Sequence, residues 1–223
     1  MADSGEAAAI LRRALEYPYA TPERSYLYRD GEAHELPAGD PDLTGRTPLL
    51  SYGANAAPEA LARKLAALPS EDLPVMRAEL EGYDVVYSAH VSPYGAVPAT
   101  LIESPGTTAP VFVLHPTAPQ RALLTATEPN YDLVELPLSS AMRAKEATRQ
   151  VEVYWSKHGP LMLDGSAVAL AAIRSAGRTL PELDEPAILK RVRAHLEPQL
   201  SLEQFVRASI ARGGMSFPPL VPL

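Results

Sequence analysis

The chain has 223 residues, a net charge of -7 at pH 7, 46% hydrophobic residues and no cysteine. Its length predicts one domain with additions or two small domains. The lack of cysteine excludes disulfides, thiolate catalysis and cysteine metal sites, and the scattered lysines and arginines form no basic patch for nucleic acid. No apolar run approaches the length of a membrane span, and Asp3 and Glu6 argue against a secretory signal, so we expect a soluble cytoplasmic protein.

The first 47 residues predict a helix and a hairpin that pack on the rest of the chain. Apolar residues recur at helical spacing from Glu6 to Glu16, and Pro18 ends the pattern. Two short strands flank Asp30-Gly31, a dipeptide typical of two-residue hairpin turns. Four tyrosines offer apolar area for this packing, with a tyrosine binding platform as the alternative: Tyr17, Tyr19, Tyr26 and Tyr28.

The centre of the chain predicts many short strands and one helix. The predicted strands are residues 49–52, 75–80, 84–91, 97–103, 110–114, 131–136 and 151–155, separated by glycine and proline breaks. The helix runs from Ala118 to Thr127, and Pro129 closes it. Residues 139–150 fit either a helix or a loop. This pattern predicts an α+β fold built on a small mixed β-barrel or a strongly curved sheet.

The C-terminal part predicts helices over residues 165–176, 186–196 and 201–212, followed by a proline-rich tail. Gly177 suits the position after the first helix, and Ser201 with Gln204 has capping-box spacing for the third. These helices could form a lid, an oligomer surface or a covering layer.

The most informative stretch is a predicted strand, loop and helix from Leu49 to Leu65. Gly53 and Asn55 follow the apolar strand, and both residue types tolerate the left-handed conformations of a sharp turn. Pro58 then suits the first helical position. Such a loop directs several backbone N–H groups into one concavity, which predicts a cradle for an anion or a carbonyl. A purely structural joint is the alternative.

Several stretches, taken in order, resemble the gamma-glutamylcyclotransferase-like family. Tyr52-Gly53-Ala54-Asn55 is similar to the family's Tyr-Gly-Ser-Asn signature, with Ala54 in place of serine. Residues 82–88, 98–106, 111–114 and 123–131 resemble the elements that follow it. The resemblance spans Leu49 to Leu136 and implies a mixed-sheet barrel with the substrate cavity at one mouth. It divides the chain into an N-terminal helix and hairpin (1–47), a barrel (48–160) and a C-terminal helical extension with a proline-rich tail (161–223).

The resemblance places the family's catalytic glutamate on Glu128, as a general acid/base. The residues that it implies for substrate binding are Tyr52, Gly53, Ala54, Asn55 and Tyr131. From the residues alone, Pro129 disfavours the α region for Glu128, so this carboxylate is held at a helix-to-strand break. A solvated carboxylate at a helix end is the alternative.

The implied reaction is the cyclising cleavage of a gamma-glutamyl amide to 5-oxoproline and a free amine or amino acid. It needs no metal and no organic cofactor. The expected partner is a small-molecule gamma-glutamyl substrate, without nucleic acid or membrane, and a homodimer is the oligomer considered. One alternative is a non-catalytic binding or scaffold protein on the same fold, which Ala54 and Thr125 favour because the family usually has serine and an acid there. Another is an acyltransferase or amide hydrolase that uses the same cavity.

Other polar residues lack the surroundings of a site. The five histidines are dispersed without metal-ligand spacing, so structural roles are expected for them. Ser51, Ser88 and Ser92 lack the context of a nucleophile elbow.

Overall fold

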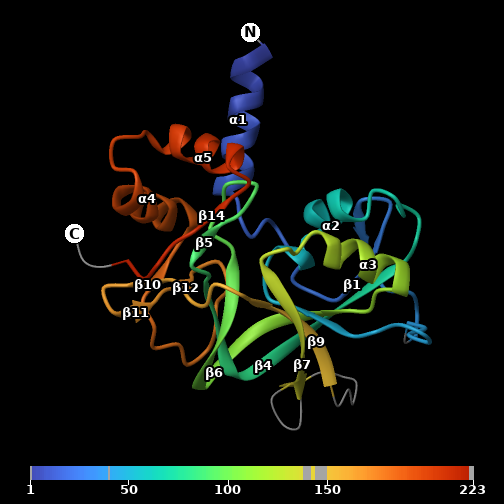
Figure 1. The fold of residues 1–223 in the computed structure, drawn as a ribbon. Coiled ribbons are helices and arrows are strands. Elements are labelled where there is room, and N and C mark those ends of the chain that lie inside the picture. The colour runs from blue at the N-terminus through green and yellow to red at the C-terminus, as the bar shows by residue number, and fades with distance from the viewer. Residues whose placement is uncertain (1, 40, 138–141, 144–149, 221–223) are drawn as a thin grey trace.

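A mixed β-sheet forms the centre of the protein, and helices lie around it (Figure 1). The structure is a computed structural model that describes residues 2–39, 41–137, 142–143 and 150–220. Along its main path the sheet runs in the order β13 (Glu182–Leu183), β12 (Ala169–Leu170), β4 (Leu73–Tyr87), β6 (Ala99–Leu114), β3 (Leu49–Ser51), β9 (Gln150–Ser156) and β7 (Tyr131–Pro137). The β3–β9 and β12–β13 pairs are parallel and the other pairs on this path are antiparallel, which makes the sheet mixed.

The sheet is open, so the predicted barrel is wrong. Within the described residues, β13 and β7 are the two ends of the path and no pairing joins them. The neighbours of β4 explain this, since its first three residues pair with β1 (Tyr26–Arg29), its middle with β8 (Met142–Arg143) and its end with β12. The long strand β4 therefore pairs with different strands along its length, and the sheet does not close into a barrel.

The long antiparallel pair β4–β6 takes the place of four shorter predicted strands. The register of the pair shifts at Gly82, where φ is 79°, a left-handed value that favours glycine. Gly106 lies within β6 with φ 86°. Each predicted glycine break thus bends a strand without ending it, as β-bulges do.

The N-terminal prediction is confirmed. Helix α1 covers Ala2–Leu15, and β1 forms a hairpin with β2 (Glu32–His34) around Asp30 and Gly31, which both have positive φ. All four tyrosines of this segment are buried, as packing on the core requires.

The helices form two groups on the sheet. Helix α1 packs with α4 (Glu185–Leu196) and α5 (Leu202–Ala211), whereas α2 (Pro58–Lys64) and α3 (Ala118–Ala126) lie over the other end of the sheet (Figure 1). The predicted capping box of α5 is present, because Ser201 and Gln204 exchange hydrogen bonds. In the part of the chain that the structure describes, no helix is both long and apolar enough to cross a membrane.

The helix predicted over residues 165–176 is wrong. This stretch instead forms β11 (Ser166–Ala167), which pairs with β10 (Met162–Leu163), and then β12, which pairs with β4. The Tyr87 N–H donates to the Val168 carbonyl over 2.9 Å. The extended backbone of this stretch therefore pairs the backbone hydrogen-bonding groups at the end of β4. This tertiary pairing overrides the local helix propensity of the alanine-rich sequence.

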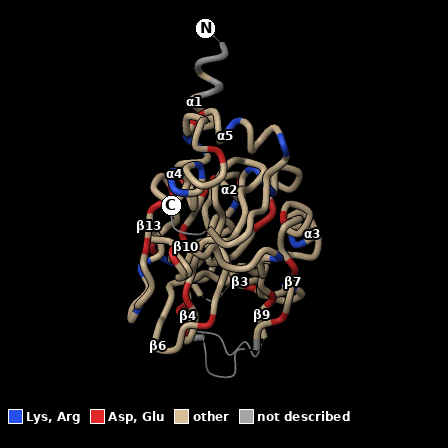
Figure 2. The backbone as a smooth tube through the Cα atoms, turned by 60° about the vertical axis from the view of Figure 1, so that its left-hand side comes forward, with Lys and Arg blue, Asp and Glu red and all other residues tan. Residues whose placement is uncertain are grey.

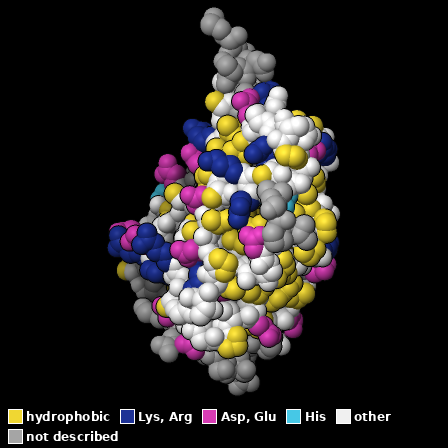
Figure 3. Space-filling model, turned by 90° about the vertical axis from the view of Figure 1, so that its left-hand side faces the viewer, with side chains coloured by type: hydrophobic (Ala, Val, Ile, Leu, Met, Phe, Trp, Pro, Cys, Tyr) yellow, Lys and Arg dark blue, Asp and Glu magenta, His cyan; other side chains and the backbone are white. Residues whose placement is uncertain are grey.

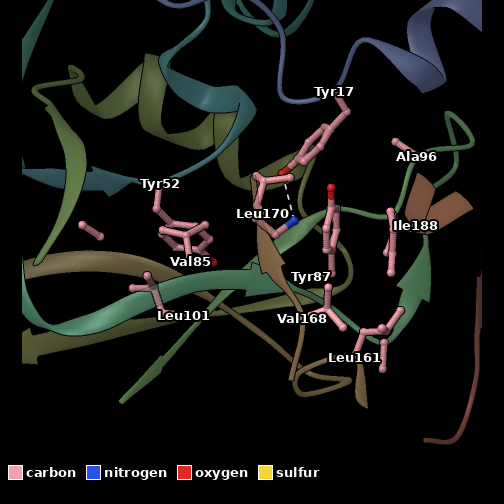
Figure 4. Packing of buried hydrophobic residues seen from close by; sticks show 14 of the residues in the cluster. Tyr17, Tyr52, Val85, Tyr87, Ala96, Leu101, Leu161, Val168, Leu170 and Ile188 are labelled. Atoms are coloured by element: carbon pink, nitrogen blue, oxygen red, sulfur yellow. Dashed lines mark hydrogen bonds between the residues drawn. The ribbon is translucent and has the colours of Figure 1, made fainter. Parts of the chain in front are cut away.

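The C-terminal segment completes the main core. Leu202 and Ile210 pack half-buried on the same core, in which five apolar residues of α4 and α5 are fully buried: Ile188, Leu189, Val192, Phe205 and Val206. Figure 4 shows Ile188, Leu161 and Val168 around Tyr87 of β4, with Tyr17 of the N-terminal segment on the other side of the Tyr87 ring. The tail returns along the core, where β14 (Met215–Ser216) pairs with β5 (His90–Val91). The division into three segments stays a prediction, and most of residues 139–150 lies outside the described residues.

Acidic and basic residues are interspersed along the backbone (Figure 2). The face over α4 shows the same mixture between hydrophobic side chains (Figure 3). The net charge of -7 is therefore spread over the molecule, not gathered in one patch.

Candidate active site

A cavity of about 290 Å³ is lined by residues of helices from both groups, α1 and α2. Its walls come from the end of α1, the loop after β3, helix α2, the segment between β5 and β6, and the turn after α3. All six residues that the sequence analysis assigns to a site line this cavity: Tyr52, Gly53, Ala54, Asn55, Glu128 and Tyr131. Segments far apart in the sequence thus meet there, while the role of each residue stays a prediction.

The loop after β3 lines the cavity and contains unpaired backbone donors. Ala54–Ala56 forms a single 3-10 turn, η1, whose two hydrogen bonds use the N–H groups of residues 56 and 57. The N–H groups of Gly53, Ala54 and Asn55 donate no hydrogen bond to any residue that the structure describes. The three residues are half-buried and line the cavity, so their N–H groups are available to an anionic or carbonyl oxygen of a ligand.

The left-handed backbone expected for this loop is absent. Gly53 has φ -145°, which is extended, and Asn55 is in the 3-10 turn without positive φ. Glycine is needed at position 53 for another reason. A Cβ atom there would lie 2.7 Å from the Tyr17 hydroxyl oxygen, closer than real Cβ contacts.

Glu128 is held at the turn between α3 and β7 by its own backbone. Its N–H donates to the Thr125 carbonyl over 3.0 Å, and its carbonyl accepts from the Tyr131 N–H over 3.1 Å. The side chain is 14% exposed and faces the cavity wall where α2 ends. The helix-to-strand break therefore fixes this carboxylate, as Pro129 predicts.

Two side chains fix the Glu128 carboxylate through a single oxygen. Asn55 Nδ2 donates to Oε1 over 3.0 Å, and the Lys64 ammonium lies 2.5 Å from the same atom. Lys64 also donates to Asn55 Oδ1 over 2.7 Å, which closes a three-membered ring of contacts. Oε2 has no hydrogen-bond partner among the described residues. Oε1 therefore holds the carboxylate in place, and Oε2 is available to accept a proton from a ligand.

The tyrosines and the histidine of the cavity stay neutral at physiological pH. Burial raises the pKa values of Tyr52, Tyr94 and Tyr131 far above the physiological range. Burial, with the nearby His158 ring, lowers the pKa of His90 to about 3. Glu128 is accordingly the one carboxylate among the described residues that line the cavity. No group of three metal-ligating side chains that could hold an ion occurs in the described parts of the chain.

The two predicted tyrosines shape the cavity through their rings. The Tyr52 hydroxyl donates to the Tyr154 carbonyl, and the Tyr131 hydroxyl donates to the Ala99 carbonyl over 2.8 Å. Because both hydroxyl protons are used by the backbone, the rings offer apolar contact, the commoner role of buried tyrosines.

Several cavity residues were not predicted from the sequence. Lys64 has the position of an ordinary cation at a helix end, and Arg13 comes from a helix outside the family resemblance. Ser51 lacks a nucleophile elbow, yet its Oγ is buried without a hydrogen-bond partner and the residue lines the cavity. Tyr17, expected to pack, packs and also lines the wall. Only the tertiary fold brings these side chains to the loop.

No protein-family model and no curated protein matches the chain. Similar solved structures include a gamma-glutamyl cyclotransferase, 14% identical with a TM-score of 0.41, over 51% of this chain and 68% of that chain. They also include a protein from Arabidopsis thaliana, 18% identical with a TM-score of 0.36, over 54% of this chain and 66% of that chain. The first bears the name of the family that the sequence resembles. The function proposed below rests on the cavity and its residues, not on these similarities.

Proposed function

We propose that the protein cleaves gamma-glutamyl amides by cyclisation and releases 5-oxoproline with a free amine or amino acid. The observation that carries the proposal is the arrangement of one carboxylate, Glu128, and three unpaired N–H groups, those of residues 53 to 55, in a single cavity. A gamma-glutamyl group offers a carboxylate and an ammonium on the same carbon. The loop N–H groups suit the carboxylate, and Glu128 Oε2 suits the ammonium.

The chemistry needs one positioned acid/base because the substrate carries its own nucleophile. Glu128 Oε2 accepts a proton from the α-ammonium, and the freed amine attacks the γ-carbonyl carbon. A nitrogen–carbon bond forms and closes a five-membered ring, and Glu128 gives its proton to the leaving nitrogen as the bond to that nitrogen breaks. The ring nitrogen loses its second proton to the freed Glu128 carboxylate, which passes it to the released amine, so that the amine leaves as an ammonium and Glu128 is again ionised. No metal or organic cofactor takes part in these steps.

The size of each contribution follows from general rules. Holding the amine against the γ-carbonyl makes the attack intramolecular, and orientation of this kind supplies up to ~7–11 kcal/mol of the barrier. Proton transfer by a positioned group adds about 10²–10⁴-fold. Asn55 and Lys64 support both effects, since they fix the Glu128 carboxylate through Oε1 and so aim Oε2.

The cavity size favours a small substrate. A volume of about 290 Å³ lies at the lower end of the ~300–1,000 Å³ found for small-molecule sites. An open cavity with a fixed carboxylate supports a reaction over a scaffold role, in which side chains would fill this space. A hydrolase or acyltransferase would use the same groups but would release glutamate or a new amide, so the product distinguishes these alternatives. A homodimer and a cytoplasmic location stay predictions.

The test is the release of 5-oxoproline, detected by chromatography, from a panel of gamma-glutamyl amides and peptides. In Glu128→Gln the amide oxygen would keep the Asn55 and Lys64 contacts, and Nε2 would face the cavity where a proton acceptor is needed. We therefore expect release to fall about 10²-fold or more, while the protein still folds and melts cooperatively.

Glu103→Gln and Glu135→Gln are the matched controls, because both carboxylates are exposed and lie off the cavity. They should retain wild-type rates. Wild-type protein that releases no 5-oxoproline from any member of the panel would overturn the proposal. Full activity in Glu128→Gln would remove the assigned acid/base.

A further inference from the structure

A buried chain of hydrogen bonds ends at a histidine of the cavity wall. His90 Nδ1 lies 2.8 Å from Ser88 Oγ, which lies 2.6 Å from Ser156 Oγ. Ser156 Oγ also accepts the His158 N–H over 3.1 Å. Ser88, His90 and Ser156 are all buried. Of the four residues in this chain only His90 lines the cavity, so the other three lie behind the wall and support it.

The direction of these hydrogen bonds follows from the partners of Ser156. Its Oγ already accepts the His158 N–H, and Ser88 Oγ is the one acceptor that its hydroxyl reaches among the described residues. The Ser156 hydroxyl therefore donates to Ser88, and the Ser88 hydroxyl donates to His90 Nδ1. In the opposite direction a buried Ser156 proton would have no acceptor, which is costly. An imidazole that accepts at Nδ1 carries its proton on Nε2, so the hydrogen bonds assign this tautomer to His90.

The proton on Nε2 faces the cavity, and the ring stays uncharged. Nε2 has no hydrogen-bond partner among the described residues, and it keeps accessible surface although His90 as a whole is 2% exposed. Because His90 lines the cavity, this surface lies there. Burial, with the nearby His158 ring, lowers the pKa of His90 to about 3. A neutral imidazole of this kind donates a hydrogen bond to a carbonyl oxygen without giving up its proton.

We propose that His90 is a further catalytic residue, whose Nε2–H donates to the γ-carbonyl oxygen of the substrate as negative charge develops there. The inference rests on the proposed function, in which the loop N–H groups take the α-carboxylate and Glu128 takes the α-amine. The γ-carbonyl oxygen is the polar atom of the gamma-glutamyl group that these contacts leave without a donor. A preorganised donor at such an oxygen lowers the barrier because its hydrogen bond strengthens in the transition state.

Two contacts place His90 beside the turn that carries Glu128. The His90 ring centroid lies 5.8 Å from the ring centroid of Tyr131, and the neighbouring His158 Nε2 lies 3.2 Å from Asn130 Oδ1. In the cyclising step the amine nitrogen held by Glu128 bonds to the γ-carbon, so the γ-oxygen comes within two bonds of that nitrogen. The oxygen that needs a donor therefore lies near the same turn as the imidazole that offers one.

The test pairs His90→Asn with His90→Gln in the 5-oxoproline assay. The asparagine amide takes the place of Nδ1 against Ser88 and leaves the place of Nε2 empty, whereas the glutamine amide extends to the place of Nε2 and can donate there. His90→Asn should lower kcat by about 10²–10³-fold, the usual cost of losing one such donor, with a much smaller effect on KM. His90→Gln should recover a clear part of that loss. Melting curves of both variants verify that they fold.

Nitrogen–proton NMR spectra of the histidine rings give a readout that does not depend on activity. The wild type should show the His90 proton on Nε2, unchanged from about pH 5 to 8. Ser88→Ala removes the donor to Nδ1, so it should mix the two tautomers and lower kcat. Ser104→Ala is the matched control, because it also removes one hydroxyl of a pair, 2.7 Å from Thr107 Oγ1, away from the cavity. It should leave the spectrum of His90 and kcat unchanged.

Wild-type kcat in His90→Asn, or a His90 proton on Nδ1, would overturn the inference while 5-oxoproline formation stands. Equal losses of kcat in His90→Asn and His90→Gln would also overturn it, since the donor at the place of Nε2 would not matter. No 5-oxoproline from the wild type would overturn the proposed function and the inference together.

Discussion

Gly53 illustrates how one residue can be needed for a reason that local sequence does not show. Its φ of -145° is not the left-handed value that the sequence predicts. The requirement is space, because the Tyr17 hydroxyl sits 2.7 Å from where a Cβ atom would be and accepts the Ala99 N–H over 2.8 Å. A side chain at position 53 would displace a buried tyrosine that also lines the cavity.

Gly53→Ala should therefore destabilise the protein by about 1–3 kcal/mol, the usual cost of overpacking. The measurement is urea denaturation of Gly53→Ala, Tyr17→Phe and the double variant. Removing the hydroxyl relieves the close contact, so the alanine should cost clearly less in the Tyr17→Phe background. Additive effects of the two substitutions would show that the contact is not the cause.

At the scale of elements, the parts with strong local signals were predicted well. The Asp30-Gly31 hairpin, the capped helices α3 and α5 and the buried strand β3 depend on neighbours in sequence, and they are present. The helix predicted over residues 165–176 was wrong although a contrary signal existed. Asp164-Gly165 is the same dipeptide as Asp30-Gly31 in the first hairpin, and both of its residues also have positive φ. It forms the turn between β10 and β11.

Barrel closure and part of the site could not be predicted because both depend on tertiary contacts. Which neighbour each half of β4 takes is decided by segments from both ends of the chain. The loop and Glu128 were found through a motif, whereas Arg13 and Lys64 reach the cavity only because of how α1 and α2 are placed. A local sequence pattern can predict site residues such as Glu128, but it cannot predict residues such as Arg13 that depend on how helices pack.

The C-terminal segment is tied to the sheet by a buried ion pair. Arg178 binds both carboxylate oxygens of Asp84 on β4, at 2.9 and 2.8 Å, and the Asp84 side chain has no exposure. Arg178→Met should cost about 3–5 kcal/mol, because it leaves a buried carboxylate without its cation. Arg174→Met, at an exposed position nearby, should stay within about 0.5 kcal/mol in the same denaturation experiment.

The double variant Asp84→Asn with Arg178→Met tests whether the unpaired carboxylate causes the loss of stability. Removing the stranded charge should recover part of the lost stability. If Arg178→Met costs no more than Arg174→Met, the ion pair does not anchor the segment.

At the scale of the whole molecule, one buried acid should make stability depend on pH. Glu185 is 2% exposed; its Oε1 accepts the Val97 N–H over 2.7 Å, and Oε2 has no hydrogen-bond partner. Burial raises the pKa of Glu185 well above its ordinary value of 4.5. The folded state thus keeps a proton that the unfolded state loses above pH 4.5, so this group's stabilising contribution is complete below that pH and declines as pH rises toward the folded-state pKa.

Glu185→Gln keeps the shape and the Val97 contact without a titrating proton. Its advantage in stability over the wild type should grow with pH by up to about 1.4 kcal/mol per pH unit above 4.5. Urea denaturation of both proteins at pH 5.5, 6.5 and 7.5 measures this difference, and other groups cancel in the comparison. A difference that stays constant over this range would contradict the protonated state of Glu185.

The central claim is that the loop holds the α-carboxylate, and Glu128 the α-amine, of one gamma-glutamyl group. The most direct measurement is a crystal structure of the wild-type protein with 5-oxoproline, the product that keeps the carboxylate and this nitrogen. We predict that its carboxylate accepts hydrogen bonds from the N–H groups of residues 53 to 55 and that its ring N–H donates to Glu128 Oε2. A product bound with its carboxylate on Lys64 or Arg13, leaving the loop N–H groups unpaired, would contradict the account.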